Sequence, residues 1–410
     1  MHINKVKVKE AMDRKGIRTQ TDLAGMMSIT KNQLSTILAE SYLPLKANVE
    51  KLCSVLEVKP EEILDNDRKK PIAEYVSCDC EPCCITGIEL FAGAGGLALG
   101  LEKAGIHTLL YVEIDKFCCE TLKVNRPSWN VLCEDIHKVD FTPYRGKIDI
   151  VSGGFPCQAF SFAGKKLGFE DTRGTLFHEF ARCVKEVEPP MFLAENVRGL
   201  MSHDHGRTFS AIIEVLSGLG YDVQHKVLNA AFYGVGQKRE RVVIVGTRKG
   251  SGIAFDFPKP DEKMTTLREA LKDCPLSEGQ QYSENKRKYL AQVPPGGCWV
   301  DLPEEAQKEY LGKSFYSSGG RRGMARRIGW NEPCLTLTCS PSQKQTERCH
   351  PDETRPFTVR EYARIQSFPD EWTFSGGINE KYKQIGNAVP VEMARRIGAQ
   401  LVKSIRESKK

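Results

Sequence analysis

The stretch ITGIELFAGAGGLALGLEKAG, residues 85–105, predicts a buried strand that runs through a glycine-rich turn into an apolar-periodic helix. A second predicted strand, LLYVEID (109–115), ends in acidic residues, and Glu113 follows Gly93 by twenty residues. This spacing suits a nucleoside, because the turn lies beside it and the strand-end carboxylate can bond the ribose hydroxyls. Asp135 follows a third predicted strand, where it could bond an adenine amino group. The alternation of strands and helices predicts an α/β fold.

The glycine-rich turn lacks two well-known phosphate-binding patterns. The full G-x-G-x-x-G fingerprint of dinucleotide-binding enzymes is missing, and so is the GxxxxGK[ST] pattern of NTPases. A lone glycine-rich turn is weak evidence, because many open α/β sheets have one. The sequence argues against an oxidoreductase or an NTPase, and S-adenosylmethionine fits better because it has a ribose and an adenine but no phosphate.

Two reactive side chains follow further predicted strands. IDIVSGGFPCQAFSFAGKK (148–166) leads a strand to Cys157, and MFLAENV (191–197) is a strand that carries Glu195. Taken alone, the cysteine could be a small buried hydrophobe and the glutamate a capping carboxylate. Because strands of one sheet bring such residues together, the combination points to one chemical site.

A third block supplies cationic side chains. QKRERVVIVG (237–246) places Gln237, Arg239 and Arg241 at alternating positions as the chain enters a strand. Alternate residues of a strand point to the same face, so we expect the three side chains to lie together and to join the cysteine and the glutamate.

Taken together, these blocks resemble the bacterial DNA (cytosine C5)-methyltransferases of restriction–modification systems. The departures are small: Ala163 stands where the family commonly has serine, and Ile114 where a tryptophan stacks on the adenine. The matching blocks, in the order of the family, are ELFAGAGG (89–96), VEID (112–115), EDI (134–136), GGFPCQAFS (153–161), AENV (194–197), QKRER (237–241), RPFTVREYARIQSFPD (355–370) and IGNAVP (385–390).

The resemblance implies a fold, a reaction and a set of roles. The fold is a Rossmann-like S-adenosylmethionine-dependent methyltransferase sheet with a smaller target-recognition domain. Cys157 is the nucleophile that adds to C6 of a flipped cytosine, Glu195 bonds N3 and the exocyclic amine, and Arg239 and Arg241 hold the O2 side. No metal is needed, because the sulfonium of the cofactor is already activated. The residues implied to hold S-adenosyl-L-methionine are Phe91, Gly93, Gly95, Gly96, Glu113, Ile114, Asp135, Ile136, Pro156 and Asn387, the last at the start of the final helix.

The N-terminal residues 1–65 read as an all-α domain. LAGMMSITKNQLSTILAE (23–40) resembles the helix-turn-helix of the Cro/repressor type, although Ser28 replaces the usual glycine of the turn. Its second helix would enter the major groove of DNA. The alternative is a helical protein-interaction domain with the same fold. The residues that would then face DNA are Lys31, Asn32, Gln33 and Thr36.

The rest of the chain divides by composition and by the order of the blocks. We expect a linker at 66–84, a catalytic domain at 85–251, a target-recognition region at 252–345 and a C-terminal part at 346–410 that returns to the catalytic domain. Further DNA contacts are expected from Lys165 and Lys166 in a lid over the DNA, and from Arg321 and Arg322 in GGRRGMARR (319–327). Cys78, Cys80, Cys83 and Cys84 could bind Zn²⁺ but are more simply linker cysteines.

The composition of the chain argues against a membrane protein and a secreted protein. The 410 residues carry 59 Lys+Arg against 53 Asp+Glu, and the excess of basic residues lies at the two ends. No apolar run could span a bilayer, and the charged N-terminus lacks the apolar core of a secretory signal. We therefore expect a cytoplasmic protein with reduced thiols, whose partners are double-stranded DNA, operator DNA for the N-terminal domain, and a cognate restriction endonuclease acting on the same site. Two alternatives remain open: a tRNA cytosine methyltransferase, and a DNA-binding regulator with an inert catalytic half.

Overall fold

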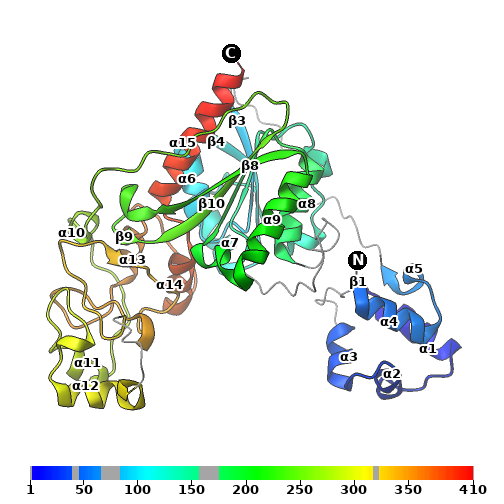
Figure 1. Cartoon of the computed structure of the whole chain (residues 1–410), viewed down its shortest axis with the longest axis horizontal. Helices are drawn as coiled ribbons and strands as arrows, with labels where there is room; N and C mark the ends of the chain where they lie inside the picture. Colours follow the sequence, from blue (N-terminus) through cyan, green and yellow to red (C-terminus); the bar gives the residue numbers. More distant parts are fainter. Residues whose placement is uncertain (1, 39–45, 66–83, 157–174, 317–322, 410) are drawn as a thin grey trace.

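The computed structural model of the chain describes residues 2–38, 46–65, 84–156, 175–316 and 323–409 (Figure 1). These residues form a helical N-terminal unit, a central sheet with helices on both faces, and a smaller lobe with little regular structure. Among them, no helix is both long and apolar enough to cross a membrane.

The N-terminal unit has its own hydrophobic core. Thr19 and Thr30 precede two of its helices, and each closes a capping box, with Asp22 and Gln33 respectively. Ser28, in the turn between these helices, has a φ of 52°, in the left-handed region that favours glycine. The elements are β1 His2–Ile3, α1 Lys5–Arg14, α2 Gln20–Met26, α3 Lys31–Ile37, α4 Lys46–Leu56, α5 Pro60–Ile63 and β2 Leu64–Asp65, the two strands pairing antiparallel.

The predicted α/β fold is confirmed by a mixed sheet of seven strands in the order β5-β4-β3-β6-β7-β10-β8. The first five are mutually parallel, and β10 runs antiparallel to both of its neighbours. The central strands are buried on both faces, as parallel strands covered by helices should be. The strands are β3 Ile85–Leu90, β4 Ile106–Glu113, β5 Val131–Cys133, β6 Ile150–Gly153, β7 Met191–Val197, β8 Tyr221–Asn229 and β10 Glu240–Arg248.

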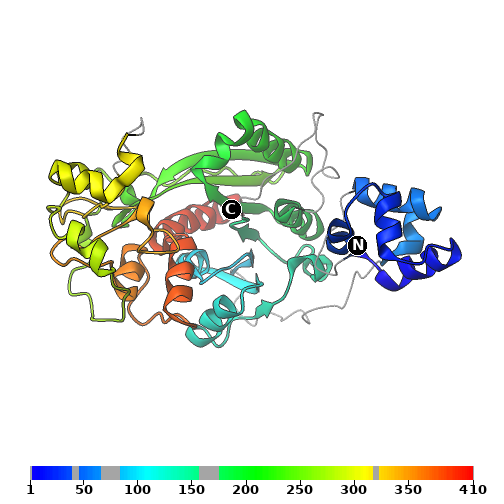
Figure 2. The same ribbon diagram turned by 90° about the horizontal axis from the view of Figure 1, so that it is seen from below.

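Two helical layers cover the sheet (Figures 1 and 2). On one face, α8 (Leu176–Val187) and α9 (Arg207–Gly218) pack on the largest core cluster. On the other face, α6 (Gly96–Lys103) and the C-terminal α15 (Val391–Ser408) form a second core with the apolar residues of the strands. α7 (Lys116–Asn125) joins a third core that it shares with the smaller lobe.

The smaller lobe is assembled from segments on both sides of the predicted boundary at residue 345. Tyr282, Tyr289 and Tyr310 share a core cluster with Cys349, so residues just beyond 345 pack with residues before it. The boundary itself stays a prediction. The elements of the lobe are α10 Leu267–Ala270, α11 Glu284–Leu290, α12 Glu304–Leu311, α13 Val359–Ile365, α14 Ile378–Asn387, and β11 Cys334–Leu335, which pairs in parallel with β9 Gln237–Lys238.

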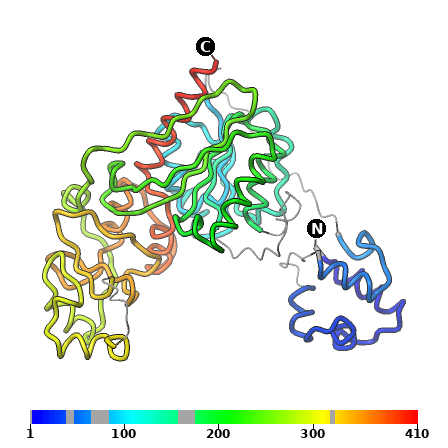
Figure 3. Tube along the Cα trace, in the orientation of Figure 1, coloured from blue at the N-terminus to red at the C-terminus, as the bar shows by residue number. Residues whose placement is uncertain are grey.

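The C-terminal segment returns from this lobe to the sheet, where α15 lies along α6 (Figure 3). The two helices approach closely because glycines face the contact. A Cβ on Gly100 would lie 2.4 Å from the Ala394 Cβ and 2.6 Å from the Val391 carbonyl oxygen. A Cβ on Gly398 would lie 2.7 Å from that of Ala104. One face of α6 therefore packs against a helix that lies nearly 300 residues further along the chain.

This contact gives a prediction about stability. We expect Gly100→Ala to lower the free energy of unfolding by about 1–3 kcal/mol, because the added methyl group must push α15 away from α6. Chemical denaturation of the purified protein measures the change. Gly218→Ala is the matched control, since a Cβ at this helical position meets nothing within 4 Å. Equal effects of the two substitutions would contradict the packing argument.

Candidate active site

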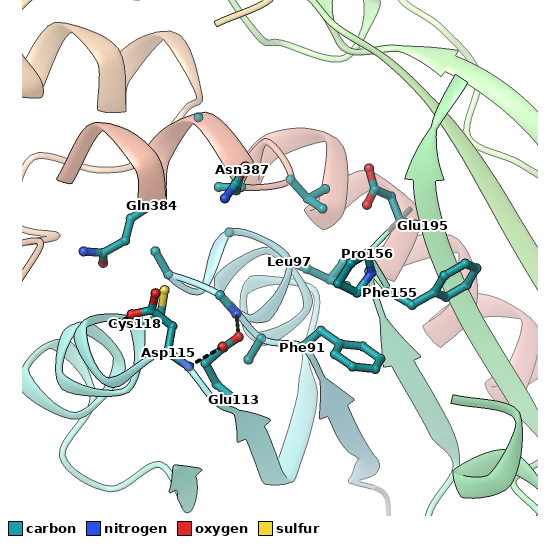
Figure 4. Close-up of a pocket in the computed structure, with 18 of the residues that line it drawn as sticks. Phe91, Leu97, Glu113, Asp115, Cys118, Phe155, Pro156, Glu195, Gln384 and Asn387 are labelled. Atoms are coloured by element: carbon teal, nitrogen blue, oxygen red, sulfur yellow. Dashed lines mark hydrogen bonds between the residues drawn. The ribbon is translucent and has the colours of Figure 1, made fainter. Parts of the chain in front are cut away.

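A cavity of about 750 Å³ opens at the carboxyl ends of the parallel strands, the usual ligand position in open α/β sheets. Its wall combines the glycine turn, the ends of β4 and β7, the start of β10 and the end of α14 (Figure 4). Of the predicted catalytic and cofactor-binding residues that the structure describes, all but one lie on this wall. They are Phe91, Gly93, Gly96, Glu113, Ile114, Asp135, Ile136, Pro156, Glu195, Arg239, Arg241 and Asn387, whereas Gly95 does not line the cavity.

Glu113 fastens the glycine turn to the end of β4. Its Oε2 accepts the Gly93 N–H at 2.7 Å, and its Oε1 accepts the N–H groups of Ile114 and Asp115, both at 2.8 Å (Figure 4). A carboxylate has about four lone-pair sites, two on each oxygen, so Oε1 is fully engaged and Oε2 can still accept a ligand hydroxyl. The strand-end acid and the glycine turn, which were both expected beside a nucleoside, are thus in direct contact.

The three glycines of the turn differ in what they face. Gly93 has a φ of +54° and would place a Cβ against nothing within 4 Å, on the cavity side. A Cβ on Gly95 would lie 2.8 Å from the Trp372 ring, and one on Gly96 would lie 2.2 Å from the Val389 carbonyl oxygen. Gly95 and Gly96 are therefore required by packing against the C-terminal segment, and Gly93 is the glycine that leaves room for a ligand.

Asp135 lies beside the cavity as predicted, just beyond β5. Its Oδ1 accepts the His137 N–H at 3.1 Å and contacts the His137 Nδ1 at 2.6 Å. This contact with His137 is the main cause that holds the pKa of Asp135 below its usual value, against the effect of burial. The side chain is therefore an ionised acceptor at neutral pH.

Glu195 and Arg241 form a buried ion pair at the inner end of the cavity. Neighbouring strands β7 and β10 bring the Arg241 Nε to 2.6 Å from the Glu195 Oε1, and about a tenth of each side chain is exposed. The N–H is not aligned with the oxygen as in a regular hydrogen bond, so Oε1 keeps acceptor capacity. Burial raises the pKa of Glu195, although Arg241 and Arg239 act in the opposite direction.

Asn196, which the sequence analysis left without a role, positions the approach to the predicted nucleophile. Its Nδ2 donates to the Phe155 carbonyl at 2.8 Å, and both groups are buried. Phe155 precedes Pro156, the last described residue before Cys157. The asparagine therefore holds the end of the segment that leads to the cysteine against the strand that carries Glu195.

Arg239 does not share the environment of Arg241, which corrects the expectation that both hold a base. The Arg239 guanidinium is 1% exposed and donates to the carbonyls of Leu337 (3.2 Å) and Gly386 (2.8 Å). Burial lowers its pKa to about 9. Gln237 is likewise bonded to the C-terminal segments, through Leu337 and Gln366. Only Arg241 of the three contacts Glu195.

Asn387 is also placed differently from the prediction. It is the last residue of α14, not the first of the final helix, which begins at Val391. Its side chain lies across the cavity from Glu113 (Figure 4), and its Oδ1 accepts a bond from the Cys339 Sγ at 2.9 Å. Several cavity residues were missed. Asp115 stands in the VEID block but was given no role, and no local pattern marks the others, which are Cys118, Thr336, Thr338, Cys339, Lys383 and Gln384.

Several predicted residues lie outside the described part of the chain: Cys157, Lys165, Lys166, Arg321, Arg322 and the cysteines at 78, 80 and 83. Two other arginines of the 319–327 cluster are described, and both bond to groups within the protein. Arg326 pairs with Glu332 at 3.0 Å. Arg327 is buried and donates to carbonyls of neighbouring segments, including those of Leu290 and Val293 at 2.7 Å.

The predicted DNA-facing residues of the N-terminal unit, Lys31, Asn32, Gln33 and Thr36, are all exposed on α3. The Gln33 Oε1 accepts the Thr30 N–H at 2.8 Å, so its carbonyl serves the helix cap and only its amide N–H₂ group remains for a base. In the part of the chain that the structure describes, no three His, Cys, Asp or Glu side chains form a metal-binding group.

Comparisons with known proteins agree with these two units. Residues 85–403 match the sequence family of the C-5 cytosine-specific DNA methylases, and residues 7–67 match the Cro/C1-type helix-turn-helix DNA-binding domain. Type II methyltransferase M.Sau96I of Staphylococcus aureus is 51% identical over 98% of both chains. M.Eco47II of Escherichia coli is 60% identical over 77% of this chain and 78% of its own length.

Solved structures give the same fold. A prophage-encoded Escherichia coli protein described as a DNA modification methyltransferase is 26% identical, with a TM-score of 0.58 over 78% of this chain and 99% of its own. A DNMT2 variant of Spodoptera frugiperda is 17% identical, with a TM-score of 0.56 over 80% of this chain and 100% of its own, which is a likeness of fold alone.

The raised pKa of Glu195 predicts how its replacement changes with pH. Folding favours the neutral acid, so this contribution to stability is full below the ordinary pKa of 4.5 and is lost as pH rises through the higher folded pKa. Glu195→Gln mimics the neutral acid. We therefore expect its free energy of unfolding to rise relative to the wild type as the pH rises above the ordinary pKa of 4.5.

Denaturant titrations at several pH values test this expectation. Glu361→Gln is the control of opposite sign, because Glu361 is held by Arg355 at 2.7 Å and its pKa is lowered despite burial. That variant should be less stable than the wild type by a constant amount above the ordinary pKa of 4.5, and its deficit should shrink only as the pH falls below that value. A Glu195→Gln difference that does not change with pH would overturn the electrostatic account.

Proposed function

Because this chain belongs to the family of C-5 cytosine-specific DNA methylases, we propose that its cavity binds S-adenosyl-L-methionine together with a cytosine flipped out of duplex DNA. The chain is a DNA cytosine-C5 methyltransferase of the type II restriction–modification kind with a helix-turn-helix domain. The proposal concerns the residues that carry out this reaction and the route that it takes.

One observation carries the proposal: a single cavity joins the carboxylates of Glu113 and Asp135 to the buried pair of Glu195 and Arg241. The first two suit a nucleoside, because each is an acceptor at the end of a strand and Gly93 leaves space beside them. The buried pair suits cytosine, because the acid of Glu195 can bond N3 and the guanidinium of Arg241 can donate to O2. Both ligands can therefore meet in one enclosure.

The roles of the chain's own groups follow from this placement. Cytosine is a poor nucleophile at C5, and addition of the Cys157 thiolate to C6 makes C5 electron-rich. Glu195, whose pKa is raised by burial, can donate a proton toward N3 and so stabilise the charge that the addition creates. Arg241 donates to O2 of the same ring and keeps the acid oriented.

The cofactor supplies an electrophilic methyl group on a sulfonium when it is bound. C5 takes up this methyl group, then loses its proton, and departure of the Cys157 thiolate from C6 restores the aromatic ring. Arg239 is not assigned to the base, because its donors are engaged with the Leu337 and Gly386 carbonyls. It supports the wall of the cavity instead.

The N-terminal domain supports a second proposed role in DNA binding. Its match to Cro/C1-type domains and the exposed polar residues of α3 favour binding of an operator, with a regulatory effect on transcription. A restriction endonuclease that cuts the same sequence would be the functional partner of the methylase. DNA is favoured over tRNA as substrate by this domain and by the type II methyltransferases among the relatives.

The nucleophile gives the first test of the proposed reaction. We expect Cys157→Ser to abolish methyl transfer while binding of duplex DNA persists, because most affinity comes from phosphate contacts elsewhere. Wild-type protein should form a covalent adduct with DNA that contains 5-fluorocytosine, since the fluorine cannot leave as a proton does. Cys274→Ser is the control, a half-buried thiol away from the cavity. Full activity of the Cys157 variant would refute the mechanism.

The separation of the two DNA-binding units gives another test. If residues 1–65 act only on an operator, a chain that starts near residue 85 should methylate the same sequence as the full protein. Asn32→Ala in the full chain should weaken operator binding by about 1–3 kcal/mol and leave the methylated sequence unchanged. Bisulfite sequencing of DNA from expressing cells reads the target. A changed target in the shortened, folded chain would make the N-terminal unit part of the methylation machinery.

A further inference from the structure

An ion pair crosses the cavity between parts of the chain that are far apart in sequence. The Lys383 Nζ on α14 lies 2.9 Å from the Oδ2 of Asp115, which follows β4 and precedes α7. Both residues line the cavity that holds Glu113. The pair therefore links the C-terminal wall of the cavity to the wall that the glycine turn and β4 provide.

The two oxygens of Asp115 have separate tasks. Oδ1 accepts the N–H groups of Phe117 at 2.9 Å and Cys118 at 3.3 Å, which caps α7. Oδ2 is the atom that meets Lys383. An asparagine at this position would keep a capping oxygen and lose the charge, so the ion pair can be broken without removing the cap.

The pair lies at the mouth of the cavity and not inside it. About half of the Lys383 side chain and a quarter of the Asp115 side chain are exposed, although both residues also line the cavity. Ile114, next in the chain to Asp115, is 68% exposed and lines the cavity too. Groups that contact both solvent and cavity lie at its rim, so the ion pair stands where it can hinder a ligand that leaves from Glu113.

Beside the ion pair, a buried set of hydrogen bonds attaches α14 to α7. The Thr121 Oγ1 donates to the Gln384 Oε1 at 2.6 Å, the Gln384 Nε2 donates to the Ser375 carbonyl at 2.8 Å, and the Ser375 N–H donates back to the Thr121 Oγ1 at 2.9 Å. This closed set keeps the helix in place when the ion pair is broken. The outer contact can therefore open while the inner one holds.

We propose that the Lys383–Asp115 ion pair is a latch across the mouth of the cavity, which slows the entry and release of S-adenosyl-L-methionine and of its demethylated product. The inference rests on the proposed cofactor site. Lys383 is a positioning residue in this proposal: it acts by closing the rim and does not touch the reacting atoms.

Both partners of the latch are charged at neutral pH. Burial acts to raise the pKa of Asp115, but hydrogen bonds from Lys383 and from the α7 amides outweigh it and lower the pKa. The hydrogen bond to Asp115 raises the pKa of Lys383. Glu380, one turn earlier on α14, lies 3.5 Å from the Lys383 Nζ and keeps the lysine near the rim when Asp115 releases it.

The test is the rate at which S-adenosylhomocysteine leaves the full-length protein, measured by stopped-flow displacement. Lys383→Met should release it roughly 1.5- to fivefold faster, the range expected for one partly exposed ion pair. Asp115→Asn should do the same, and the double variant should be no faster than either single one. Lys381→Met is the matched control on the same helix, because Lys381 pairs with Glu278 and does not line the cavity.

Two further readouts separate a latch from other roles. Added salt should speed release from the wild type but not from Lys383→Met, because salt screens a half-exposed pair. Equilibrium titration should give the same Kd for S-adenosylhomocysteine in Lys383→Met and in the wild type, because loss of a latch speeds entry and release alike. Faster release from Lys383→Met alone, with Asp115→Asn unchanged, would mean that the lysine binds the cofactor carboxylate directly, and the latch would be wrong.

The remaining outcomes are also decisive. Release rates that are the same in all variants would overturn the latch and leave the proposed function intact. A wild-type protein that binds neither S-adenosyl-L-methionine nor S-adenosylhomocysteine would overturn the proposed function, and the latch with it.

Discussion

A buried chain of amide hydrogen bonds, centred on Gln237 and Gln366, holds the cavity together. The Gln237 Oε1 accepts the Leu337 N–H at 2.8 Å, and its Nε2 donates to the Gln366 Oε1 at 3.0 Å. The Gln366 Nε2 in turn donates to the carbonyls of Ile385 and Ala388. An unmet buried amide costs about 1–3 kcal/mol, so these segments have no alternative arrangement of similar energy. The wall opposite Glu113 exists because this junction fixes it.

The same junction explains what the sequence could and could not predict. The alternation of strands and helices depends on residues close in the chain, and the approach of Glu113 to the glycine turn depends on strand ends that a parallel sheet brings together. The partners of Arg239 are carbonyls 98 and 147 residues away, and backbone carbonyls leave no mark in a sequence. Spacing therefore showed which arginines belong near the site, but not which one meets Glu195.

The charged pair at the inner end of the cavity contributes little to the stability of the fold. Glu195 and Arg241 are buried at the same inner end, and desolvation raises the pKa of the acid even beside its partner. Such a pair contributes little to stability and is retained where chemistry needs a group that can hold or donate a proton. The stability that this end lacks comes from apolar packing on both faces of the sheet and from the glycine-mediated contact of α6 with α15.

The contact of α6 with α15 also means that the cavity is completed late in the synthesis of the chain, after the N-terminal unit. The cavity needs Phe91 and Glu113 near its start and Asn387 and Val389 near its end. A growing chain on the ribosome therefore carries a finished N-terminal unit long before it carries a finished cavity, since domains fold as they emerge. Methyl transfer can begin only when almost the whole polypeptide has been synthesised. An interrupted or shortened product would still present α3 to DNA while lacking the enclosure in which a base is modified.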